Sequence, residues 1–397
     1  MVEKARSHVP FYRERLADWD LVGQDDFVRL PLLIKPEIIG QEHQLISVEV
    51  DPASLLEETT SGSSGTPLRC FKSKSERIEL AMHLWRLRAE QGRITPSDRM
   101  AEFYGFIQDG ARFRTGAIEM DGRSLCLSML DLSPSALHRY YRALCDYQPT
   151  WFFSVPSALT VLANHMLDYG LPGPATGIRY IETTGEMLFD YQKRVVETAF
   201  GCPVYNHYGC REFWLLAMSC PYGNLHLEQD HIYTEFIPVP DDPGATELVV
   251  TSLRNTEWPL IRYRLGDRVR PGVGTCSCGR PGPVLAGLAG RATELLRIGN
   301  WTANTILFFY AVSQVNALFP DSIRQFRITQ TNETELLMQC VAGRGISQEA
   351  KAVMLQALLD KLPGEARLAL ELVASIPIDG RKHTYFSPYD REETRRD

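Results

Sequence analysis

The segment from Thr59 to Pro67 consists almost entirely of Ser, Thr and Gly and lies between an acidic pair, Glu57–Glu58, and a basic run from Arg69 to Lys74. Hydroxyl groups, and backbone N–H groups without a shielding Cβ, can surround an anion, as the phosphates of a nucleotide require. A flexible linker has the same composition, so the loop alone leaves both interpretations open. Its spacing also lacks the lysine of the common GxxxxGK[ST] phosphate loop.

The hexapeptide from His207 to Glu212 directly follows a predicted strand over 203–205. Ligand contacts in α/β sheets gather where strands end. The ring of Tyr208 could stack on a nucleobase, Gly209 would permit close approach, and the Glu212 carboxylate could bind the Mg²⁺ that accompanies phosphates. A tight turn with a solvated Arg–Glu pair is the alternative interpretation.

Two further positions could contact a sugar or its phosphates. Asp267 follows Gly266 and a predicted strand over 260–263, and a carboxylate in such a place can accept both ribose hydroxyls. A self-capped turn would explain the same residues. Arg291 follows Gly290 where the pattern of elements changes, which favours a hinge carrying an arginine directed at ribose or phosphate, with a plain turn as the alternative.

Four metal-ligand candidates occur in two turn-rich segments. Cys276 and Cys278 form a closely spaced thiol pair, and Cys220 and His226 flank the sequence PYGNL. Three cysteines and one histidine make a Cys₃His set, which is typical of structural zinc. The C-x-C spacing is unusually tight and the halves are far apart, so four unligated side chains are the alternative. Bound zinc would hold the 276 loop beneath the nucleotide site.

The elements that must position these groups alternate along the chain. Helical patterns alternate with short apolar runs, which indicates α/β layers around a mainly parallel sheet. The helical patterns cover 75–91, 133–147, 156–169 and 189–200, and the strand-like runs cover 125–130, 151–154, 179–184 and 203–205. Residues 231–270 are rich in strands. Beyond about residue 290, a hairpin (325–330 and 335–341), a helix over 347–362 and a strand over 367–376 predict a small α+β unit.

Composition excludes several classes of protein. The 397 residues carry a net charge of −7 and their basic residues form no stripe, so we expect no nucleic-acid surface. The most apolar stretch, 306–319, is interrupted by polar residues and too short to span a bilayer. The charged N-terminal segment lacks the apolar core of a signal peptide. We expect a cytoplasmic protein whose nine cysteines serve as thiols or metal ligands rather than in disulfides.

In order and spacing, these motifs resemble the adenylate-forming superfamily of acyl-CoA synthetases, luciferases and peptide-synthetase adenylation domains. The likeness is strongest to the phenylacetate–CoA ligase family and runs nearly end to end. The segments that agree are VPFYRER from Val9 to Arg15, Leu30-Pro31-Leu32 with Lys35, SVPS from Ser154 to Ser157, Thr184-Gly185-Glu186, and CSCGR from Cys276 to Arg280. The resemblance implies a large N-terminal adenylate-forming α/β domain, 1–292, with layered, mainly parallel sheets, and a small mobile α+β domain, 293–397.

The resemblance also implies two half-reactions. A carboxylate attacks the α-phosphate of ATP, giving an acyl-adenylate and pyrophosphate, and a thiol or amine then displaces AMP after the small domain rotates. The implied pyrophosphate grip is Ser61, Gly62, Ser63, Ser64, Gly65 and Thr66. The implied nucleotide contacts are Gly185, Glu186, His207, Tyr208 and Gly209, with Asp267 on the ribose, Arg291 on ribose or phosphate, and Glu212 on Mg²⁺.

Several motifs depart from the family pattern. Thr66 stands where the phosphate loop usually carries lysine, and Leu265 replaces the threonine of the ribose motif. The hinge reads Gly290-Arg291-Ala292-Thr293 and lacks its aspartate. Arg211 replaces a Ser or Thr before Glu212. We expect its guanidinium to reach the α-phosphate in compensation, with a solvent-directed side chain as the alternative.

The C-terminal Gly-Lys signature appears as Gly380-Arg381-Lys382-His383. We expect Lys382 to be the catalytic lysine of the first half-reaction, contacting the carboxylate and the α-phosphate. Arg381 is its competitor for that role.

Aromatic candidates for the acid pocket favour a flat aryl or arylalkyl substrate, although aromatic side chains are also ordinary core residues. Trp214 would shorten the pocket toward a benzoate-like acid. The acceptor stays open between CoA, a carrier-protein thiol and an amine, and a non-catalytic nucleotide-binding relative is a further alternative. The expected cofactors are ATP, Mg²⁺ and a structural Zn²⁺, and a homodimer is one option for assembly. The pocket candidates are Tyr104, Phe106, Phe113 and Trp214.

Overall fold

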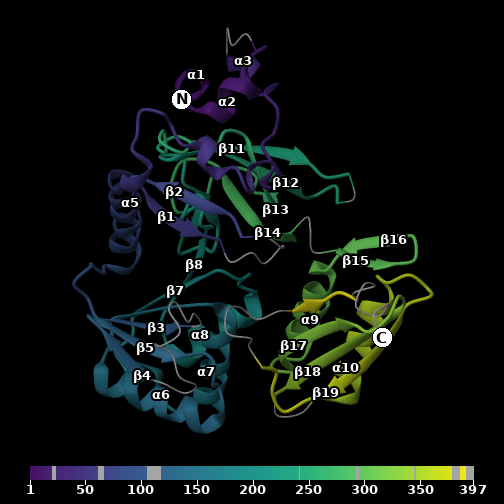
Figure 1. Cartoon of the computed structure of the whole chain (residues 1–397). Coiled ribbons are helices and arrows are strands. Elements are labelled where there is room, and N and C mark those ends of the chain that lie inside the picture. Colours follow the sequence, from purple (N-terminus) through teal and green to yellow (C-terminus); the bar gives the residue numbers. More distant parts are fainter. Residues whose placement is uncertain are drawn as a thin grey trace. The chain divides into compact units, whose positions relative to one another are not determined.

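The computed structural model describes residues 1–19, 24–60, 67–104, 118–240, 242–291, 295–343, 346–377 and 385–389. Figure 1 shows the elements coloured by their place in the sequence. The chain divides into two compact units. Unit 1 combines Met1–Arg93 with His207–Thr293, and unit 2 combines Ile94–Asn206 with Glu294–Asp397. Neither unit coincides with the predicted domains 1–292 and 293–397, and that division stays a prediction. Movement of 293–397 as a separate domain stays a prediction.

Unit 1 begins with short helices that cover its strands. They are α1 (Val2–His8), α2 (Pro10–Arg15), α3 (Gln24–Phe27) and α4 (Lys35–Ile38), with 3-10 turns η1 (Glu42–Leu45) and η2 (Pro52–Ser54). Tyr12 anchors this layer, because its buried hydroxyl donates to Pro259 O and accepts from Ile261 N, each at 3.0 Å. The N-terminal helices therefore form part of the unit 1 core.

A hairpin carries the predicted phosphate loop. Strands β1 (Leu56–Thr59) and β2 (Arg69–Lys72) pair antiparallel. Thr60 closes the loop, because its N–H donates to Leu68 O and its Oγ1 accepts from Leu68 N, both at 2.9 Å. The predicted contacts Ser61 to Thr66 connect these strands and lie outside the described residues. Helix α5 (Lys74–Gly92) follows directly.

The remaining strands of unit 1 pair in the order β11-β12-β13-β14-β10-β9-β8, and all of the pairs are antiparallel. Strand β8 begins in unit 2 and ends in unit 1. The bounds are β8 Val204–Tyr208, β9 Ala217–Ser219, β10 Leu225–Leu227, β11 Ile232–Pro238, β12 Thr246–Ser252, β13 Tyr263–Pro271 and β14 Val284–Arg291.

The predicted strand over 260–263 was wrong. Arg262 has a φ of 50°, a left-handed conformation that interrupts extended pairing, and its buried guanidinium binds Glu235 at 2.9 Å. The strand therefore starts only at Tyr263. Asp267 consequently lies inside β13, beside a register shift, and does not follow the end of a strand.

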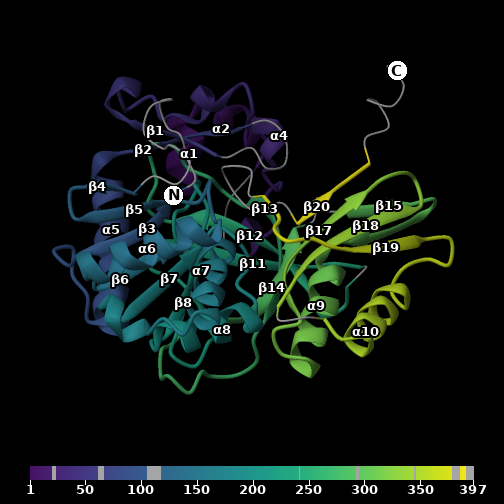
Figure 2. The same cartoon turned by 90° about the horizontal axis from the view of Figure 1, so that it is seen from below.

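Unit 2 contains the parallel part of the fold. Its strands order as β7-β6-β3-β5-β4, with parallel pairs except for β4 with β5. Helices α6, α7 and α8 cover one face of these strands, as Figure 2 shows, and share a hydrophobic core with them. The expected α/β class is confirmed. The bounds are β3 Met100–Tyr104, β4 Ile118–Asp121, β5 Ser124–Ser128, α6 Pro134–Tyr147, β6 Trp151–Ser154, α7 Pro156–Asp168, η3 Gly173–Thr176, β7 Tyr180–Thr184 and α8 Asp190–Phe200.

The C-terminal part of unit 2 is an α+β layer. Its four-stranded sheet has the order β19-β18-β17-β20, and α9 and α10 contribute to the same core. The predicted hairpin is confirmed, and the helix predicted over 347–362 follows its cap Ser347 but ends at Leu359. Arg324 joins this layer to α7 through Asp168 at 2.7 Å. The bounds are β15 Leu295–Ile298, β16 Trp301–Asn304, α9 Ile306–Leu318, β17 Ile323–Gln330, β18 Glu335–Ala342, α10 Gln348–Leu359, β19 Arg367–Leu372 and β20 Phe386–Ser387.

Within the described ranges, none of the helices combines the length and the apolar character needed to cross a membrane.

Candidate nucleotide site and metal centre

Three of the predicted nucleotide residues meet at one carboxylate in unit 1. The hydroxyl of Tyr208 donates to Asp267 Oδ2 at 2.8 Å, and Arg291 Nε donates to Oδ1 at 3.2 Å. Burial, reinforced by the Asp267 charge, raises the pKa of Tyr208 well above its usual range, so the phenol remains a donor. The ends of β8 and β14 and the middle of β13 therefore bring the base, hinge and ribose candidates into one hydrogen-bonded group.

The loop after β8 is tightly folded. A Cβ at position 209 would lie 1.8 Å from the carbonyl oxygen of Trp214, so only glycine fits there. His207 Nε2 lies 3.2 Å from the same oxygen, and Trp214 itself has a φ of 64°. Gly209 thus makes room for the protein's own backbone, which is a different need from the ligand approach that the sequence predicts. Glu212, the Mg²⁺ candidate, accepts a hydrogen bond from the Tyr263 hydroxyl at 3.3 Å.

Arg211 and Trp214 are held by neighbours that the sequence does not reveal. The Arg211 side chain is exposed, and its carbonyl oxygen accepts from Lys72 Nζ at 2.7 Å. Trp214 Nε1 donates to Glu58 Oε2 at 2.8 Å, and the Arg77 guanidinium lies 4.5 Å from the indole centroid. The Trp214 ring is therefore fixed against β1 and α5, and its predicted contact with the acid stays a prediction.

Other predicted residues are only partly covered by the structure. Tyr104 ends β3, but its side chain, like Phe106, Phe113 and Lys382, lies outside the described residues. Gly185 has a φ of 81°. In unit 2, Glu186 caps helix α7, because its carboxylate accepts from the Ser157 N–H at 3.1 Å and from the hydroxyl at 3.0 Å. A carboxylate at a helix N-terminus is favoured by the helix dipole.

The four predicted zinc ligands come together in unit 1. One ligand atom from each of Cys220, His226, Cys276 and Cys278 lies within 4.8 Å of all the others. Ideal tetrahedral zinc would separate two sulfurs by about 3.8 Å and a sulfur from a nitrogen by about 3.6 Å. The observed separations are 3.6 Å between Cys220 and Cys276 and 3.3 Å between Cys278 and His226 Nε2. The donor set and its spacing therefore fit a tetrahedral ion.

Donors around Cys276 favour its thiolate form, whereas burial raises the pKa of Cys220. The Cys278 backbone N–H, aided by the side chains of Asn224, His226 and Cys278, lowers the pKa of Cys276 to about 6. Asn224 Nδ2 lies 3.2 Å from Cys276 Sγ, and the Arg280 N–H lies 3.5 Å from Cys278 Sγ. Metal ligation requires thiolates. Asn224 lies in the turn between two of the ligands, but its residue type alone did not indicate this contact.

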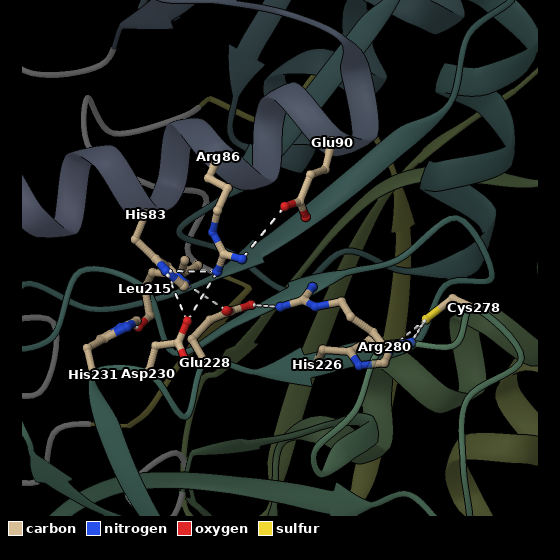
Figure 3. Close-up of polar contacts among 10 residues, drawn as sticks. All are labelled: His83, Arg86, Glu90, Leu215, His226, Glu228, Asp230, His231, Cys278 and Arg280. Carbon is tan, nitrogen blue, oxygen red and sulfur yellow. Dashed lines mark hydrogen bonds and ion pairs between the residues drawn. The ribbon is translucent and has the colours of Figure 1, made fainter.

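A buried carboxylate braces this centre, as Figure 3 shows. Glu228 is only 3% exposed and follows the ligand His226 by two residues, as Arg280 follows Cys278. The Arg280 guanidinium donates to one Glu228 oxygen, and His83 Nε2 of α5 donates to the other at 2.8 Å. Burial alone would favour the neutral acid, but these two donors hold the pKa of Glu228 below its usual value. Glu228 therefore connects both halves of the metal centre to α5.

Several known proteins are similar to the chain in sequence or in fold. The chain is 25% identical over 313 residues to the phenylacetate–coenzyme A ligase of Pseudomonas putida, covering 75% of this chain and 69% of that one. The chain is thus similar in sequence to the phenylacetate–coenzyme A ligases. It is also 25% identical over 248 residues to the indoleacetate–lysine synthetase of Pseudomonas savastanoi, covering 62% of this chain and 60% of that one. No protein-family model matches the chain.

The fold of the chain also matches a solved CoA ligase. The structure of 2-hydroxyisobutyryl-CoA ligase in its postadenylation state, bound to an acyl-AMP, has a TM-score of 0.76. The match covers 100% of this chain and 88% of that one at 21% identity. The end-to-end likeness expected from the motifs is confirmed at the level of the fold.

Proposed function

We propose that the protein activates a carboxylic acid with ATP as an acyl-adenylate, releases pyrophosphate, and transfers the acyl group to CoA, giving acyl-CoA and AMP. The observation that carries this proposal is the hydrogen-bonded group of Tyr208, Asp267 and Arg291. It unites the residues that the family pattern assigns to base, ribose and hinge, on a fold that matches an acyl-AMP-bound ligase over its whole length.

The residues fall into complementary roles in this proposal. Asp267 accepts ribose hydroxyls, Tyr208 packs along the base, and Glu212 binds the Mg²⁺ that accompanies the phosphates. Lys382 neutralises charge at the reacting carboxylate and α-phosphate. Such chemistry depends on position and charge more than on covalent catalysis. Zinc at the Cys₃His centre would be structural, since all four positions of a tetrahedron are filled by protein ligands.

The acid that we favour is aryl or arylalkyl. The support is the aromatic character of the segments after Met100 and Glu212, together with the phenylacetate-named relatives. A small aliphatic acid is the competing class, because 2-hydroxyisobutyryl-CoA ligase shares the fold.

ATP–pyrophosphate exchange with a panel of aryl and small aliphatic acids tests the first half-reaction. We expect exchange that depends on one acid class, and exchange with none of the acids would contradict the proposal. Addition of CoA and detection of acyl-CoA by mass spectrometry then tests the second half-reaction. A variant Asp267→Asn should raise the KM for ATP without abolishing folding.

A second acceptor class is an amine. The observation that favours it is the similarity to indoleacetate–lysine synthetase over 248 residues. Lysine and other amines, supplied in place of CoA, should give an amide product if this alternative is right. A carrier-protein thiol is tested in the same way with phosphopantetheinylated carrier protein.

A further inference from the structure

A fully buried lysine lies at the base of the hairpin that carries the predicted phosphate loop. Lys72, the last residue of β2, has 0% of its surface exposed. Its Nζ donates to the Arg211 carbonyl oxygen at 2.7 Å and lies 3.7 Å from Glu58 Oε2. An ammonium group withdrawn from water needs such partners. The strand β2 is thereby bound to the loop that follows β8.

Glu58 makes the second connection between the same two segments. It lies on β1, diagonally across the hairpin from Lys72. Its carboxylate accepts from Trp214 Nε1 and from Arg77 Nη1, both at 2.8 Å. The Arg77 guanidinium also covers the Trp214 ring. Both strands of the hairpin and the start of α5 are therefore fixed to the 208–214 loop.

We propose that Lys72 is a positioning residue for ATP, which with Glu58 holds the 208–214 loop, and with it Tyr208 and Glu212, against β1 and β2. The inference rests on the proposed function. ATP binding depends on the placement of the groups that contact it, and in the proposed function Tyr208 and Glu212 of this loop are two of those groups. The Lys72 ammonium faces the Arg211 carbonyl and the Glu58 carboxylate, so it acts through the backbone and does not replace the missing loop lysine.

Lys72→Met tests the proposal, with Lys74→Met as the matched control at an exposed position two residues later. In pyrophosphate exchange we expect the KM for ATP to rise about tenfold or more in Lys72→Met. The KM for the acid should change less than about twofold, and the control should match the wild type. A general loss of structure would lower kcat in proportion to the folded fraction and leave both KM values unchanged.

The double variant Glu58→Gln/Lys72→Met keeps the test decisive if Lys72→Met fails to fold, because it leaves no unpaired buried carboxylate. An unchanged KM for ATP in either folded variant would overturn the proposal, as would a fall in kcat alone. Calorimetric measurement of MgATP binding distinguishes a failure of the positioning role of Lys72 from a failure of the proposed function. A wild type that binds MgATP but shows no exchange with any acid contradicts the function, whereas unchanged binding by Lys72→Met contradicts the positioning role.

Discussion

Glu76 should make the stability of the protein depend on pH. This residue of α5 is 6% exposed, and its Oε2 is buried without a hydrogen-bond partner. Burial raises its pKa from 4.5 to about 8; Lys72 opposes the rise, and the carboxylates of Glu257, Glu58 and Glu79 add to it. Glu76 is therefore protonated in the folded protein at neutral pH and ionised in the unfolded chain.

The direction and size of the effect follow from these two pKa values. The folded-state value is the higher one, so the contribution to stability is complete below about pH 4.5 and is lost as the pH rises to about 8. Each pH unit in this window changes the free energy of unfolding by about 1.4 kcal/mol. Over the whole window the loss is of the order of 4–5 kcal/mol.

Glu76→Gln removes the ionisable group and keeps its shape. Urea unfolding of variant and wild type, followed by tryptophan fluorescence at pH 5, 6.5 and 8, measures the difference. We expect the stability of the variant relative to the wild type to rise by several kcal/mol between pH 5 and 8. Glu90→Gln, at an exposed position near the end of the same helix, is the charge-matched control. Parallel pH profiles for Glu76→Gln and wild type would refute the reasoning.

Three further predictions concern the metal centre and the tight loop. Purified protein should retain about one zinc after mild chelation, and Cys278→Ser should lose it; a wild-type content under ~0.5 equivalents by atomic emission would contradict the site. Glu228→Gln keeps all four ligands but weakens the brace, and should cost about 2–4 kcal/mol in urea unfolding, whereas an effect below about 0.5 kcal/mol would show that the brace is unimportant. Gly209→Ala should yield insoluble or strongly destabilised protein, because its Cβ would overlap the Trp214 carbonyl; a normal melting temperature would contradict the model of this loop.

Local signals predicted most elements because they act within one turn or one strand. The helix predicted over 133–147 is an example. Its N-cap, Ser133, accepts with its side-chain hydroxyl from the backbone N–H of Ala136, three residues further along the chain. The prediction of a strand over 260–263 was wrong because a contact distant in sequence, and no local signal, decides the conformation there. What ends extended structure there is the buried pair of Arg262 with Glu235, and a partner 27 residues away leaves no mark in the local pattern.

In the candidate site too, some residues could be predicted from the sequence and others could not. The metal ligands could be named because thiols and imidazoles are rare and chemically specific. The brace of Glu228 and Arg280 could not be predicted. In the sequence these residues resemble ordinary surface charges, and only the pairing of β10 with β14 brings them together. Lys72 likewise reads as one of a basic run, and its acceptor on Arg211 is 139 residues away.

The metal centre has a consequence for the order of folding. Cys220 and His226 flank the turn between β9 and β10, while Cys276, 56 residues beyond Cys220, lies between β13 and β14. Each turn alone offers two ligands, and closing a chain segment of that length costs entropy that two ligands repay poorly. A zinc ion would therefore be captured only after β10 has found β14. Because zinc would bind after the sheet has formed, it should slow unfolding and leave the rate of folding nearly unchanged. The metal centre would then stabilise the folded sheet kinetically.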